Sequence, residues 1–169
     1  MTRTPTSGRF GRLRRFLGGE DGAALVEFAI VLPMMLLVFA VIIEGSRLMI
    51  AFQSAIGGVR DATRYLARVV PSDICTTGGS VSGYAPQLQT IVGQSTSGGS
   101  FLPAGVIVNS VTPALTCVAG TYRISPAPVA SVTAKVSITF PFAGIFGLNG
   151  GTLAPIVTNV SDSARVFGS

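Results

Sequence analysis

The side chains that could carry out chemistry are few in this sequence, and Glu27 is the most unusual of them. It is the only charged residue in the apolar run Ala23–Ile43. An acid at the centre of a membrane helix costs about 3 kcal/mol on insertion scales, so a residue of this kind is functional by default. The alternative is that Glu27 lies near the bilayer surface, where water reaches it and the cost is smaller.

Most of the residue combinations that enzymes use are absent from the sequence. It contains no His, which excludes Ser-His-Asp and Cys-His arrangements. Past the N-terminal helical region the only acids are Asp73 and Asp162, which are far apart in sequence and do not indicate a carboxylate pair. Neither a G-x-x-x-x-G-K-[ST] loop nor a G-x-G-x-x-G fingerprint after a strand occurs. We therefore expect a protein that is not an enzyme, with no cofactor, no metal and no small-molecule substrate.

The run Ala23–Ile43 is long enough to cross the hydrocarbon core of a bilayer as one helix. Pro33 lies inside it and predicts a kink, which membrane helices tolerate. Five arginines precede the run, so the positive-inside rule places the N-terminus in the cytoplasm. No convincing small-x-small cleavage site follows the run, so the segment is expected to stay with the protein rather than to leave as a secretory signal peptide. These features predict a single-pass bacterial inner-membrane protein with its C-terminal part outside the cytoplasm.

The net charge of +5 does not indicate a nucleic-acid-binding protein. Most of the basic residues flank the apolar run, and few occur in the last hundred positions. A nucleic-acid-binding domain is expected to gather its basic residues on one face. We therefore expect no nucleic-acid partner.

The remaining pattern predicts an α+β fold with three segments: a basic cytoplasmic leader at 1–22, a transmembrane helix that continues as an amphipathic helix at 23–70, and a β-rich domain with Gly/Ser-rich loops at 71–169. Apolar residues mostly three or four positions apart extend the helix beyond the membrane. They are Leu48, Phe52, Ile56, Val59, Leu66 and Val69. The pair Gly57-Gly58 predicts a bend, and Pro71 predicts the end of the helix.

The β-rich segment predicts a small antiparallel sheet packed on the helix. One short helix is expected near 86–92. Strands are expected at 105–111, at 114–118 paired in a hairpin with 121–124, at 129–142 and at 153–167. The strand at 129–142 has the clearest alternation of apolar and polar residues, which is typical of a strand with one buried and one wet face.

The cysteines, Cys75 and Cys117, both lie in the part expected outside the cytoplasm. An even count in an oxidising compartment favours one disulfide between them. Such a bond would stabilise the fold by about 4 kcal/mol in the chain-entropy model. The alternative is two independent buried thiols.

Gly22 stands five residues before Glu27, behind the basic leader and directly ahead of the apolar helix. This arrangement resembles a type IV prepilin processing site, in which a membrane peptidase cuts after the Gly. Cleavage would leave an ammonium group on Ala23, and in an assembled fibre that group can pair with Glu27 of a neighbouring subunit. The pairing offsets the burial of both charges in apolar packing and sets an axial register.

Residues 22–66 more broadly resemble the TadE-like (TadE/TadG-type) pseudopilins of the tight-adherence (Flp) pilus system. Several blocks in this order carry the resemblance: Val26-Glu27-Phe28-Ala29, Leu32-Pro33, Glu44 with Arg47, and Arg60–Tyr65. The resemblance implies a minor pilin that is processed after Gly22, with Glu27 and Phe28 in recognition between subunits. Its implied partners are the inner membrane, a prepilin peptidase, other pilins or pseudopilins and the proteins of the assembly platform. Two alternatives are an uncleaved assembly factor of the same system and a membrane-anchored binding or adhesion module.

Overall fold

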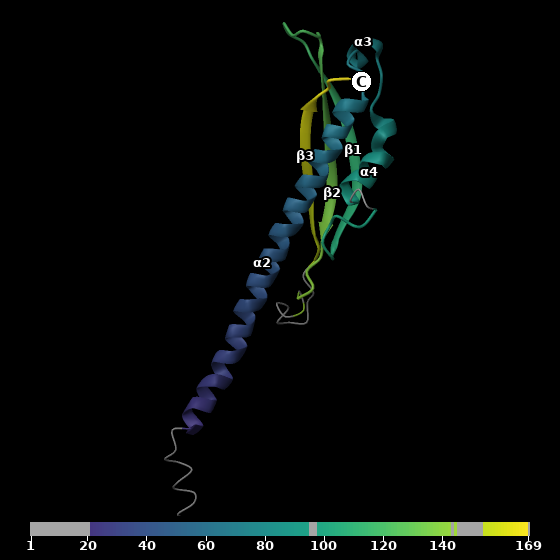
Figure 1. Cartoon of the computed structure of the whole chain (residues 1–169). Helices are drawn as coiled ribbons and strands as arrows, with labels where there is room; N and C mark the ends of the chain where they lie inside the picture. Colours follow the sequence, from purple (N-terminus) through teal and green to yellow (C-terminus); the bar gives the residue numbers. More distant parts are fainter. Residues whose placement is uncertain (1–20, 95–97, 143, 145–153, 169) are drawn as a thin grey trace, which may run out of the picture. The chain divides into compact units, whose positions relative to one another are not determined.

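The computed structural model describes residues 21–94, 98–142, 144 and 154–168 (Figure 1), so the basic leader lies almost wholly outside the described residues. It has the predicted α+β layout, with a long N-terminal helix followed by a three-stranded antiparallel sheet. The chain divides into two compact units, and the boundary between Ile42 and Ile43 falls inside the long helix.

The long helix, α2, runs from Asp21 to Val69, close to the predicted bounds. It contains Pro33 and passes through Gly57 and Gly58 without interruption, so the predicted bend at this glycine pair is wrong. Gly58 instead permits a close contact with the short helix α4 (Ala85–Gly93), because a Cβ atom at this position would lie 2.7 Å from the carbonyl oxygen of Val92. Glycine is therefore required by helix packing at this point and not by a change of direction.

The sheet contains β1 (Val106–Val118), β2 (Ala127–Ile138) and β3 (Ile156–Arg165), in that order and all antiparallel. The predicted hairpin between 114–118 and 121–124 is wrong, because 106–118 is one strand that pairs with β2. Pro113 lies inside β1 opposite Val132. β1 is an edge strand, and an edge tolerates proline when its missing N–H faces away from the neighbouring strand. β2 also ends at Ile138, four residues before the predicted end at Phe142.

The core lies between α2 and one face of the sheet. In β2 every second residue from Ala130 to Ile138 is buried, which confirms the predicted alternation. The helix buries a row of small and branched side chains, Ala51, Ala55, Val59, Ala62 and Leu66, and Val70 just after its end is buried as well. Ile56 was expected on this face but is 43% exposed. The buried side is therefore centred on alanines, which allow close approach, and not on the largest apolar residues.

A disulfide joins Cys75, in the short helix α3 (Ile74–Thr77), to Cys117 near the end of β1, with the two Cα atoms 5.8 Å apart. It confirms the predicted pairing and excludes the alternative of two free thiols. The bond connects the segment that follows α2 to the sheet. The predicted short helix in this segment is present as α4, preceded by the 3-10 helix η1 (Ser82–Tyr84).

Candidate functional site

The first turns of α2 hold the residues that the sequence singled out. Gly22, Ala23, Glu27 and Phe28 are all exposed. Gly22 is the second residue of the helix, and no atom lies within 4 Å of the position that its Cβ would occupy. The first N–H groups of a helix have no partner within the helix, so opening this end costs little. A peptidase can therefore reach the bond between Gly22 and Ala23 without disturbing a packed core.

Ala23 and Glu27 are four residues apart in α2 and therefore lie on the same side of the helix, one turn apart. The Glu27 carboxylate is exposed on this side of the helix. Phe28, the residue next to Glu27, is 62% exposed and adds an apolar side chain to this exposed surface. An exposed acid and an exposed aromatic ring at this end of the helix suit contact with another helix.

The part of α2 from Leu25 to Ile43 exposes nearly all of its large apolar side chains. A helix of a soluble protein buries its apolar residues along one stripe, whereas exposure around the whole circumference is typical of a helix in lipid. By length and composition this helix can cross a membrane. It therefore fits a single-pass membrane anchor, and Pro33 is contained within it.

Two charged residues attach α2 to the end of the sheet just beyond the apolar run. The Glu44 side chain is buried, and its carboxylate accepts a hydrogen bond from the backbone N–H of Phe142 at 2.6 Å. Arg47 donates from Nη2 to the carbonyl oxygen of Ala104 at 3.1 Å. Sequence reasoning noted this pair only as a block of the family pattern. The structure assigns it a role in holding α2 against the loops that border β1 and β2.

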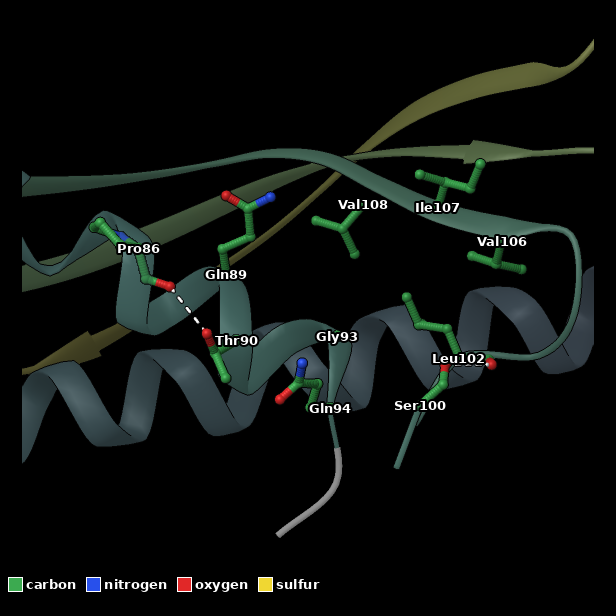
Figure 2. A pocket seen from close by; sticks show the side chains of 10 residues that line it. All are labelled: Pro86, Gln89, Thr90, Gly93, Gln94, Ser100, Leu102, Val106, Ile107 and Val108. Carbon is green, nitrogen blue, oxygen red and sulfur yellow. Dashed lines mark hydrogen bonds between the residues drawn. The ribbon is translucent and has the colours of Figure 1, made fainter. Parts of the chain in front are cut away.

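An open groove of about 590 Å³ lies between α4 and the start of β1 (Figure 2). Gln89, Thr90 and Gln94 border it on the helix side, and Val106, Ile107 and Val108 border it on the strand side. The Thr90 hydroxyl is turned back onto the helix, where it donates to the carbonyl of Pro86 at 3.2 Å. None of the ten lining residues has an ionisable side chain. The groove can accept hydrogen bonds and apolar contacts but cannot supply an acid or a base.

Three arginines of α2 lie on its exposed side beyond Gly58. Arg60, Arg64 and Arg68 are exposed, and Arg64 lies 3.9 Å from the carboxylate of Asp61. An exposed pair of this kind adds little to stability. In the part of the chain that the structure describes, no group of three or more His, Cys, Asp or Glu side chains could hold a metal ion.

Comparison with known families addresses most of α2. Residues 22–64 match the family described as TadE-like protein. This region is TadE-like. The match spans Gly22, Glu27, Glu44 and Arg47. Neither a curated protein nor a solved structure matches the chain. The TadE-like region ends before the disulfide, the groove and the sheet.

Proposed function

We propose that this protein is a pseudopilin-like minor pilin of the tight-adherence (Flp) pilus system, and that a prepilin peptidase cuts it after Gly22. The observation that carries the proposal is the combination of an accessible Gly22, an apolar helix that exposes nearly all of its large side chains, and Glu27 one turn beyond Ala23, all inside the TadE-like region. Each of these features alone is common. Together they provide the cut site, the anchor and the charge that a pilin-like subunit needs.

The proposed topology has the leader in the cytoplasm, one span in the inner membrane and residues 71–169 outside. The arginines before the span support this orientation. The Cys75–Cys117 disulfide supports it independently, because disulfides persist in oxidising compartments and are rare in the cytosol. The proposed partners are the prepilin peptidase, other pilins or pseudopilins and the assembly platform in the membrane.

The experiment that tests the proposal measures the N-terminal residue of the membrane form by mass spectrometry, in cells with and without a prepilin peptidase. We expect the chain to begin at Ala23 only when the peptidase is present. If Met1 and the leader persist in both cell lines, cleavage is excluded. The permanently anchored assembly factor of the same system then becomes the better hypothesis.

Glu27→Gln should separate processing from assembly. The amide keeps the shape of the side chain but removes the charge that pairs with the ammonium of Ala23, and that ammonium is then left unpaired when the helices pack. We expect normal cleavage after Gly22 but a severalfold loss of co-purification with other pilus subunits from detergent extracts. Glu27→Asp, which keeps the charge on a shorter side chain, should retain part of the association. Full association of Glu27→Gln would remove the proposed role of the charge.

A further inference from the structure

The strand β3 has one edge that no other described strand pairs with. The strand order is β1-β2-β3, so within the described residues β3 pairs with β2 alone. Its register with β2 is unbroken from the pair Val129↔Arg165 to the pair Ile138↔Ile156. A long, regular edge strand is a ready template for pairing with another chain unless the protein protects that edge.

One hydrogen bond of the ladder shows which backbone groups of β3 face this edge. The N–H of Val166 donates to the carbonyl oxygen of Pro128 at 2.9 Å, one step beyond the last pair of the two strands, so Val166 faces β2. Because the two directions alternate along an antiparallel strand, the odd-numbered residues of β3 direct their N–H and C=O groups outward. They are Val157, Asn159, Ser161, Ser163 and Arg165. Within the described residues none of these backbone groups has a hydrogen-bond partner.

The opposite edge of the sheet, on β1, is protected in three ways. Its register with β2 shifts between Val108 and Ser110. Pro113 lies opposite Val132, which directs its backbone groups to β3, so the N–H that Pro113 lacks would have faced outward. The helix α4 also lies against β1 (Figure 1). β3 has neither a register shift nor a proline, so the two edges are not equivalent.

The side of α2 away from α4 adds exposed apolar surface on the β3 side of the sheet. Gly58 faces α4, as its close approach to Val92 shows. Ile56 is two residues from Gly58, about 200° around the helix, and therefore lies on the side of α2 away from α4. It is 43% exposed, and Ile156 is 40% exposed on the face of the sheet that packs on α2. A strand added beside β3 would find apolar side chains to contact on its α2-facing side.

Asp162 makes this edge selective. It pairs with the buried Val132, so its side chain lies on the α2-facing side of β3. The residue is half-buried, and it forms no ion pair with any described residue. A charge that points inward at a sheet edge disfavours a strand that places an apolar or acidic side chain opposite it. A strand that brings a cation to this position is favoured instead, because opposite charges attract across a strand pair.

We propose that β3 accepts a strand from another protein chain, which joins the sheet as a fourth strand. The occupant is an extended segment with apolar side chains on the side that faces α2 and a Lys or Arg beside Asp162. Backbone hydrogen bonds to the outward groups of β3 provide the affinity, and the side chains on the α2-facing side provide the specificity. The proposal depends neither on cleavage after Gly22 nor on the membrane span.

The probe for the test is a fluorescein-labelled peptide, as long as β3, in which Thr and Val alternate and one Val is replaced by Lys. Its binding to the full-length protein in detergent is measured by fluorescence anisotropy. Ser161→Pro removes one outward N–H and leaves the bonds to β2 in place, and Ser161→Ala is the matched control that keeps the N–H. We expect Ser161→Pro to weaken binding about tenfold, because a hydrogen bond is lost and the ring obstructs the incoming strand. Ser161→Ala should bind like the unmodified protein.

Two further measurements test the chemistry of the occupant. The unmodified protein should bind the Lys peptide severalfold more tightly than the same peptide with Glu in place of Lys, and Asp162→Asn should remove this difference. A Lys peptide that is N-methylated at every amide has no N–H donors and should not bind. The N-methylated peptide is measured with the unmodified protein, so this test stands even if Ser161→Pro fails to fold. Retention of the disulfide and of the circular dichroism spectrum shows that each variant is folded.

Equal binding of the peptide to folded Ser161→Pro and Ser161→Ala would overturn the proposal, and so would binding of the N-methylated peptide. Equal binding of the Lys and Glu peptides to the unmodified protein would overturn the role of Asp162. A dimer of the unmodified protein that Ser161→Pro dissociates would overturn the proposed occupant, because a second copy of this chain would then pair with β3.

Discussion

Gly22→Val should leave the leader on the chain in cells that contain the prepilin peptidase. The cut bond joins Gly22 to Ala23, and the peptidase has to bring its catalytic groups close to the carbonyl of residue 22. Glycine has no Cβ and permits this approach, whereas a branched side chain next to the carbonyl obstructs it. We expect complete loss of the form that begins at Ala23, measured by mass spectrometry of the membrane fraction.

The structure offers a matched control for this substitution. Gly45 is also an exposed glycine of α2 with no atom within 4 Å of its Cβ position, so Val at either site adds the same side chain without a clash. Gly45→Val should be processed like the unmodified protein. If Gly22→Val is still cut after residue 22, the requirement for glycine is wrong. If both variants remain uncut, the effect comes from the helix or from membrane insertion and does not identify the site.

The sequence predicted the parts of the fold that depend on local pattern. The apolar run and its amphipathic extension predicted α2 to within two residues at its N-terminal end, and the alternation around Ala130–Ile138 predicted the central strand. It failed where tertiary contacts decide between alternatives. Separate strands were predicted at 105–111 and 114–118, but an edge position allows one strand to continue through Pro113. Gly58 was expected to bend the helix, but α4 needs it for close packing.

The candidate site divides in the same way. The spacing of Gly22 and Glu27 depends only on neighbouring residues, so this candidate site could be predicted from the sequence. The buried Glu44 bonds to Phe142, ninety-eight positions away, and no local pattern indicates such a partner. The groove likewise joins α4 to β1. Surfaces assembled from distant segments require the fold before they can be recognised.

Replacing both cysteines, with Cys75→Ser and Cys117→Ser together, should produce the largest loss of stability of any change outside the core. The disulfide closes a loop with a sequence separation of 42, and in the chain-entropy model such a bond stabilises the fold by about 4 kcal/mol. Small domains are stable by about 5–15 kcal/mol in total. The loss is therefore a large fraction of the stability of the domain, and it should be visible as a lower urea midpoint in pulse proteolysis of the full chain in detergent.

Reduction of the unmodified protein provides the control for this experiment. A reductant should lower the midpoint of the unmodified chain toward that of the double variant and should leave the double variant unchanged, because only the first contains a bond to break. Equal midpoints for the oxidised protein and the double variant would show that the bond adds no stability.

The two cysteines also report topology. In intact cells their thiols should resist alkylation until a reductant is added, as expected for a domain that folds outside the cytoplasm. Free thiols in untreated cells would contradict that location.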